Sequence, residues 1–127
     1  MKEVILDFLS SLEGYHQRLK EIHFSTLNKS EHLLADDMDG DVLEYQDRIA
    51  EASMGCLNTR FGIGDLKTLV PSAKNMADLV KELLGDIESL IAKLSDSKKY
   101  NGIINVLDDF TESVNKWNYL RTFKCYG

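Results

Sequence analysis

The residues best suited to chemistry lie between positions 31 and 51, where the sequence EHLLADDMDGDVLEYQDRIAE contains eight carboxylates, one histidine and one glycine. Imidazole nitrogen and carboxylate oxygen together form a mixed set of ligands that suits Fe(II) or Mn(II), with Zn(II) as an alternative. If the stretch is helical, a rotation of about 100° per residue groups four candidate ligands on the side opposite the apolar stripe. These candidates are His32, Asp36, Asp47 and Glu51.

A calcium-binding loop is another interpretation of DDMDGD, at the centre of this stretch. An EF-hand loop with Gly40 at its sixth position needs an oxygen ligand at its first position and a glutamate at its twelfth. Those positions hold Ala35 and Gln46. The loop would lack its first ligand and its bidentate ligand, which disfavours a calcium site.

A single helix cannot bring all four candidates to one ion, because His32 and Glu51 would lie about 28 Å apart along its axis. Their positions are, however, symmetric about a point between residues 41 and 42. Two copies of the helix packed antiparallel about a twofold axis at that point would place His32 opposite Glu51 of the second copy, and Asp36 opposite Asp47. The alternative is that these side chains form only a solvated acidic surface.

The rest of the chain predicts the helices that would position these residues. Apolar side chains recur at alternating intervals of three and four residues, which indicates amphipathic helices over about residues 2–27, 31–60, 76–94 and 103–117. Ser30 is the predicted N-cap of the second helix. Gly40 would lie inside that helix, beside the proposed twofold axis, where a missing side chain lets two backbones approach closely.

The links between the helices predict an all-α four-helix bundle in a single domain, residues 1–127. Short links make the first two helices one antiparallel hairpin and the last two another. The segment FGIGDLKTLVPS, which holds the only proline, joins the hairpins. It either makes a turn or crosses over the length of the bundle, since twelve extended residues span roughly 40 Å.

Composition limits the classes of function. The net charge is −6, and the 15 Lys and Arg residues are scattered rather than gathered into a tail or stripe, which disfavours nucleic-acid binding. No apolar run has the length of a membrane span, and the N-terminus lacks the features of a secretory signal. Together with two widely separated cysteines, Cys56 and Cys125, these features predict a cytoplasmic protein in a reducing compartment.

Several short motifs resemble those of the Dps family, the miniferritins of the ferritin-like superfamily. EHLLAD and DRIAE resemble the family's Leu-His-x-x-x-Asp/Glu and Asp-x-Ile-Ala-Glu segments, HF at 23–24 resembles its His-Trp pair, and KWNYLRTF resembles its closing segment. The resemblance implies a ferritin-like four-helix bundle that oxidises Fe(II) with peroxide or oxygen between two subunits, and that stores iron if the dimers assemble into a shell. It implies metal ligands, or their immediate neighbours, at His23, His32, Asp36, Asp47 and Glu51.

The chain departs from the family pattern at three points. His23 lies only nine residues before His32, so a histidine that borders the core is an equally open interpretation of His23. The connection between the second and third helices is shorter than in typical members, and the basic N-terminal extension used on DNA is absent. A helical interaction protein without a working metal site is therefore the alternative function. His16 is interpreted as a packing or surface residue.

Overall fold

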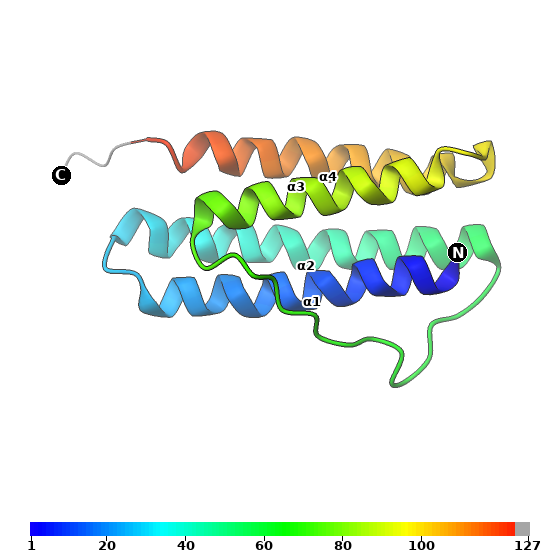
Figure 1. Ribbon diagram of the computed structural model, residues 1–127, viewed down its shortest axis with the longest axis horizontal. Coiled ribbons are helices and arrows are strands. Elements are labelled where there is room, and N and C mark those ends of the chain that lie inside the picture. Colours follow the sequence, from blue (N-terminus) through cyan, green and yellow to red (C-terminus); the bar gives the residue numbers. More distant parts are fainter. Residues whose placement is uncertain (124–127) are drawn as a thin grey trace.

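The computed structural model describes residues 1–123, and four long helices make up most of this range (Figure 1). The elements are α1 (Lys2–Ser25), α2 (Lys29–Leu57), α3 (Met76–Leu94), the short 3-10 helix η1 (Lys98–Tyr100) and α4 (Asn101–Leu120). No strand occurs among the described residues. The predicted all-α fold of four helices is confirmed.

Two asparagines determine the ends of α2. The side chain of Asn28 accepts a hydrogen bond from the backbone N–H of Glu31 at 3.1 Å. The predicted cap at Ser30 is therefore wrong, because the backbone leaves the helical conformation at Asn28 and Ser30 already lies inside the helix. At the other end, Asn58 adopts the left-handed conformation with φ 48°, which ends the helix at Leu57, earlier than predicted.

The segment between α2 and α3, residues 58–75, runs back along the bundle beside α1 (Figure 1). The backbone N–H of Leu69 donates to the carbonyl oxygen of Ser10 at 3.0 Å. The backbone N–H of Lys67 donates to the Ser10 hydroxyl at 2.9 Å. Of the two routes that the sequence left open, the chain takes the longer one, which we call the crossover. As a result, α2 and α3 run in the same direction.

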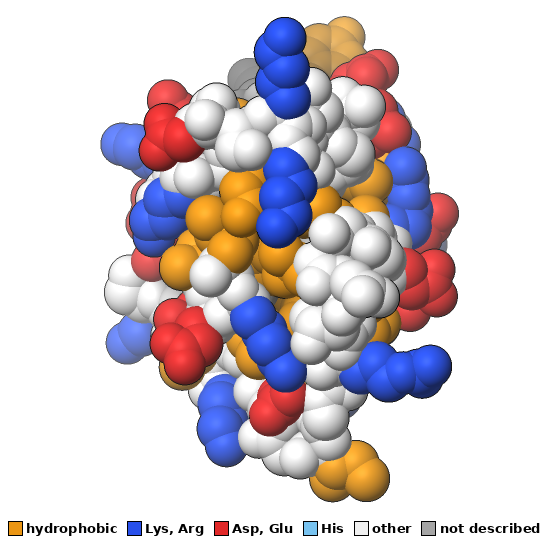
Figure 2. Space-filling view, turned by 90° about the vertical axis from the view of Figure 1, so that its right-hand side faces the viewer, with side chains coloured by type: hydrophobic (Ala, Val, Ile, Leu, Met, Phe, Trp, Pro, Cys, Tyr) orange, Lys and Arg blue, Asp and Glu red, His pale blue; other side chains and the backbone are white. Residues whose placement is uncertain are grey.

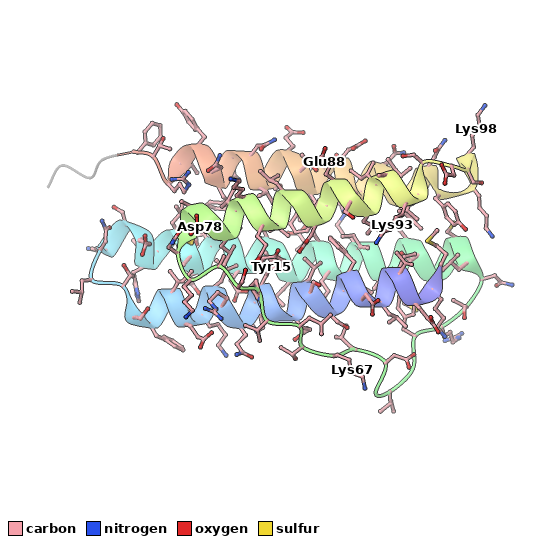
Figure 3. All side chains as sticks on the ribbon, viewed as in Figure 1. Tyr15, Lys67, Asp78, Glu88, Lys93 and Lys98 are labelled. Carbon is pink, nitrogen blue, oxygen red and sulfur yellow. The ribbon has the colours of Figure 1, made fainter. Side chains whose placement is uncertain are left out.

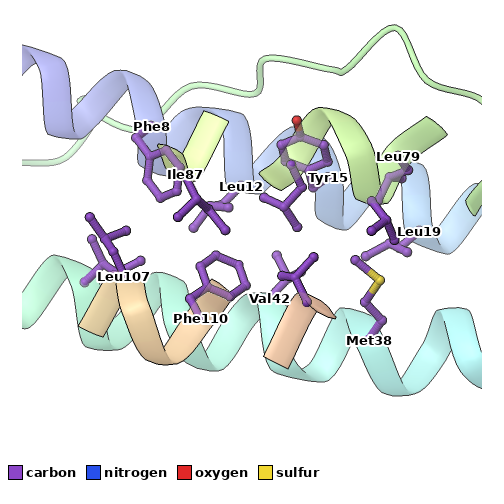
Figure 4. Packing of buried hydrophobic residues seen from close by; sticks show 14 of the residues in the cluster. Phe8, Leu12, Tyr15, Leu19, Met38, Val42, Leu79, Ile87, Leu107 and Phe110 are labelled. Atoms are coloured by element: carbon purple, nitrogen blue, oxygen red, sulfur yellow. The ribbon is translucent and has the colours of Figure 1, made fainter. Parts of the chain in front are cut away.

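The apolar stripes of the four helices meet in one core. α1 packs against α2 and α3, and α4 packs against the same two helices. Figure 4 shows the side chains that fill the space between them, all of which are buried: Phe8, Leu12, Tyr15 and Leu19 from α1, Met38 and Val42 from α2, Leu79 and Ile87 from α3, and Leu107 and Phe110 from α4. Removal of this apolar surface from water is the main favourable contribution to the folding free energy.

The surface mixes charges of both signs. Viewed from the end where the N-terminus and η1 lie, hydrophobic side chains at the centre are surrounded by Lys, Arg, Asp and Glu (Figure 2). Cys56 is a free thiol that contacts the carbonyl oxygen of Lys99 at 3.1 Å, whereas Cys125 lies outside the described residues. Within residues 1–123, no helix combines the length and the apolar character needed to cross a membrane. The cytoplasmic location stays a prediction.

The crossover can lie on α1 because residue 14 is a glycine. A Cβ atom built on Gly14 would be 1.8 Å from the carbonyl oxygen of Leu69 and 2.8 Å from the Cα of Val70. Both distances are far inside van der Waals contact. The opposing atoms are backbone, so they cannot rotate away as the end of a side chain could. The close packing of the crossover therefore depends on the missing side chain.

We expect Gly14→Ala to lower the free energy of unfolding by about 1–3 kcal/mol, because the added methyl group would push the crossover off α1. Gly85→Ala is the matched control, since Gly85 lies in α3 and an added Cβ meets nothing within 4 Å. The control should stabilise the protein by up to about 1 kcal/mol through helix propensity. Urea unfolding followed by circular dichroism measures both variants, and equal effects would contradict the close packing.

Candidate metal centre

Two of the predicted ligands, His23 and His32, meet where α1 turns into α2. Their rings stack with centroids 3.8 Å apart and an interplanar angle of 15°. His23 Nδ1 lies 2.6 Å from the carbonyl oxygen of His32, and His32 Nδ1 lies 2.5 Å from the carbonyl oxygen of His23. Both side chains are half-buried. We call this reciprocal arrangement the histidine pair.

The hydrogen bonds of the histidine pair determine where the ring protons lie. A carbonyl oxygen can only accept, so Nδ1 carries a proton in both rings. In the neutral imidazole the lone pair is then on Nε2, which is the atom able to bind a metal ion. Metal-binding histidines are usually held in this way, by a hydrogen bond from the other ring nitrogen to a carbonyl or carboxylate. The histidine pair thus provides two oriented imidazoles with the donor atom of each left free of these bonds.

The predicted carboxylate ligands lie on the outside of α2. Asp36, Asp47 and Glu51 are exposed, whereas His32 is turned towards α1, where it stacks on His23. In the part of the chain that the structure describes, no three His, Cys, Asp or Glu side chains converge to hold a metal ion. One chain therefore brings the two histidines together and leaves the three carboxylates without a common centre.

The outside of α2 also has the properties of a helix-packing surface. Gly40 is exposed near the middle of the helix, and a Cβ built there meets nothing within 4 Å. Leu33 is 52% exposed and Leu43 is 37% exposed. We call this surface the outer face of α2 and define it by the following residues: Leu33, Asp36, Gly40, Leu43, Asp47 and Glu51.

A polar pair that the sequence did not predict joins His16 of α1 to Asp39 of α2. His16 Nδ1 lies 2.7 Å and 2.9 Å from the two carboxylate oxygens of Asp39, which is 9% exposed. Burial raises the pKa of Asp39; the hydrogen bond from His16 opposes this shift, and the charge of Asp36 adds to it. The expected role of His16 in packing or at the surface did not include this partner, because the two residues belong to different helices.

His16 and Asp39 form the middle one of three polar contacts that recur at regular intervals between α1 and α2. Seven residues earlier in α1, the carbonyl oxygen of Leu9 accepts a hydrogen bond from the Gln46 amide at 3.2 Å. Seven residues later in α1, the histidine pair follows. The partners in α2 are also seven residues apart. A repeat of seven residues is close to two helical turns, so all three contacts lie along the same seam.

Tyr15 makes a buried polar contact on a different side of α1. Its ring lies between α1 and α3 (Figure 3). Its hydroxyl donates to the carboxylate of Asp86 at 2.6 Å. Burial and the neighbouring carboxylate both raise the pKa of Tyr15. The phenol therefore stays protonated and serves as a hydrogen-bond donor within the core, which satisfies its polar group.

No protein-family model, curated protein or solved structure matches the chain. A functional interpretation therefore depends on the geometry of the histidine pair and the outer face of α2, together with the residues that resemble the Dps motifs.

We expect Asp39→Asn to change how stability depends on pH. Because the folded protein raises the pKa of Asp39 above its ordinary value of 3.8, the folded state holds this proton more tightly than the unfolded state does. The stability that protonation of Asp39 contributes is therefore fully present below the ordinary pKa and is lost as pH rises through the raised value.

Urea unfolding of the wild type and of Asp39→Asn, between about pH 4 and pH 7, measures this effect. The free energy of unfolding of the wild type should fall relative to that of Asp39→Asn as pH rises. Asp37→Asn, an exposed change on the same helix, is the control and should not alter the slope. A wild-type free energy of unfolding that stays constant or rises relative to that of Asp39→Asn as pH increases would contradict the burial of the charged carboxylate.

Proposed function

We propose that this chain is an iron-binding protein of the Dps-like, ferritin-like type. In this proposal it oxidises Fe(II) with peroxide or oxygen at metal sites between two subunits, and it stores the product if the dimers assemble into a larger shell. Mn(II) and Zn(II) are the alternative metals for the same ligands. The protein acts in the cytoplasm and binds neither nucleic acid nor membrane.

The histidine pair is the observation that carries the proposal. It supplies two imidazoles whose Nδ1 protons are held by backbone carbonyls, as in the usual setting of metal-binding histidines. His23 and His32 are also the two histidines that the Dps-like motifs assign to the metal. The contact between them links these two motifs in space, although they lie on different helices.

The connectivity of the bundle supports the ferritin-like assignment. Two antiparallel hairpins are joined by one long crossover, so α2 and α3 are parallel (Figure 1). Bundles of the ferritin-like class have one such long connection, whereas simple up-and-down bundles have only short ones.

A second copy of the chain would complete the site. Two α2 helices packed antiparallel about an axis between residues 41 and 42 would bring Asp47 and Glu51 of one copy towards the histidine pair and Asp36 of the other. The same axis places Leu43 of each copy opposite Gly40 of the other. Because the Gly40 backbone is bare and Leu43 is 37% exposed, the leucine could pack against the glycine at the centre of the contact.

The charge of the outer face connects assembly to metal binding. Each cluster in such a dimer would contain three carboxylates, Asp36 from one copy and Asp47 and Glu51 from the other, and like charges brought together repel. A divalent cation would offset this repulsion. The carboxylates would balance the charge of the Fe(II) substrate, and the imidazoles would orient it and leave positions open for the oxidant.

Anaerobic titration of metal-free protein with Fe(II), followed by calorimetry, tests the proposal. We expect saturable binding of about two irons per dimer, or a multiple of that number if each cluster holds more than one ion. Binding at these intersubunit sites should be lost in the Asp47→Asn, Glu51→Gln double variant, because both side chains are exposed ligands rather than packing residues.

The Asp37→Asn, Glu44→Gln double variant is the matched control. It makes the same change of charge at two exposed positions of α2 that are not among the proposed ligands, so its binding should resemble that of the wild type. If folded, dimeric wild-type protein shows no saturable binding that depends on Asp47 and Glu51, α2 carries only a solvated acidic face. The chain would then be better described as a helical interaction protein.

Gly40→Leu tests the proposed dimer separately from the metal. Its side chain would enter open space in one chain but would collide with the second copy, so we expect the dimer to weaken at least about tenfold while the monomer stays folded. Analytical ultracentrifugation with Fe(II) present measures the dissociation constant. Gly85→Leu, at an equally open position in α3, is the control. An unchanged dissociation constant for Gly40→Leu would exclude this axis.

A further inference from the structure

A second group of potential metal ligands lies away from the outer face of α2. It lines a pocket of about 320 Å³ beside α1, bordered on one side by Thr68 of the crossover. Glu13 and His16, which are three residues apart on α1, both line this pocket. Residues at this spacing are neighbours on the surface of a helix, so their side chains can reach the same ion.

A partner on α2 orients His16. Its Nδ1 bonds to the Asp39 carboxylate at 2.7 Å, so Nδ1 carries a proton and the neutral ring keeps its lone pair on Nε2. A carboxylate that holds an imidazole in this way also makes the imidazole a stronger ligand. The arrangement therefore combines a directed nitrogen donor with an adjacent, nearly buried negative charge.

Glu13 is oriented by a different residue of α2. Its Oε1 accepts a hydrogen bond from the Gln46 amide at 2.9 Å, and Gln46 is itself anchored to the carbonyl oxygen of Leu9. The amide is neutral and does not offset the negative charge of Glu13, and the second carboxylate oxygen accepts no hydrogen bond from residues 1–123. Both potential ligands are thus held in place by neighbouring side chains rather than extended freely into solvent.

We propose that Glu13 and His16 bind a divalent first-row metal ion in this pocket, with water completing the coordination and with Asp39 and Gln46 as positioning residues. One imidazole and one carboxylate form the mixed nitrogen and oxygen donor set that such ions accept. The site needs only one copy of the chain and no residue of the proposed intersubunit site. An experiment can therefore support or refute this site independently of the proposed function.

Lys20 is the group that opposes binding. It also lines the pocket, and its charge acts on Asp39, so it competes with a cation for the same negative potential. Its side chain is exposed, however, which allows it to swing into solvent. Because of this competition, removing the charge of Lys20 should strengthen metal binding, whereas removing a ligand should weaken it.

Titration with Zn²⁺, followed by ¹⁵N NMR of labelled histidine rings, tests the proposal directly. The chain has three histidines, so each ring can be assigned by its loss in a single His→Gln variant. We expect the Nε2 signal of His16 to shift and saturate with Zn²⁺ in the wild type, and to do so equally in the Asp47→Asn, Glu51→Gln variant. A signal of His16 that does not move while those of His23 and His32 do would overturn this proposal and leave the proposed function intact.

Variants of the surrounding residues separate a metal site from a structural contact. Asp39→Asn should weaken Zn²⁺ binding at His16 about 10–100-fold, since it keeps an acceptor for Nδ1 but removes the charge. Glu13→Gln should also weaken binding, whereas Lys20→Gln should strengthen it by up to about fivefold. Asp37→Asn, an exposed change outside the pocket, is the control for charge alone. Equal affinities for the wild type, Asp39→Asn and Glu13→Gln would overturn the site.

Discussion

The antiparallel register of α1 and α2 determines which polar groups of these two helices meet. The three contacts of Leu9 with Gln46, His16 with Asp39, and the histidine pair recur every seven residues along both helices. A shift of one helix by a single turn would separate all three contacts at once. It would also move apolar side chains of both helices out of the core, which makes such a shift energetically costly. The apolar packing therefore maintains the polar seam.

The crossover determines which surfaces remain available. It runs along α1, held at Ser10 by hydrogen bonds and accommodated by Gly14, so α1 is covered by α2, α3 and the crossover together. Among residues 1–123, α2 packs mainly against α1 and α4, and its outer face stays exposed. A short turn between the two hairpins would have left α1 without this cover. The route of the chain thus covers α1 and leaves the outer face of α2 exposed.

The three histidines occupy two kinds of electrostatic setting. The histidine pair is held by neutral backbone carbonyls, whereas His16 is held by a carboxylate whose charge is largely withdrawn from water. A carboxylate partner places a full negative charge beside the imidazole, whereas a carbonyl oxygen carries only a partial charge. The exposed carboxylates of α2 remain well hydrated, so bringing them together requires a compensating cation. The two candidate metal sites therefore differ in how deeply their carboxylates are buried and in the group that holds each imidazole.

The four helices and their apolar faces could be predicted from the sequence, because the spacing of apolar residues reports directly which side of a helix leaves water. It also indicated His32, Asp36, Asp47 and Glu51 as a group, since positions along one helix follow from its geometry. The folded chain was needed to see that His23 stacks on His32, that Asp39 is the partner of His16, and that the chain crosses over rather than turns. These outcomes depend on contacts between distant segments, and on one absent side chain at Gly14, whose importance appears only when the crossover lies against it.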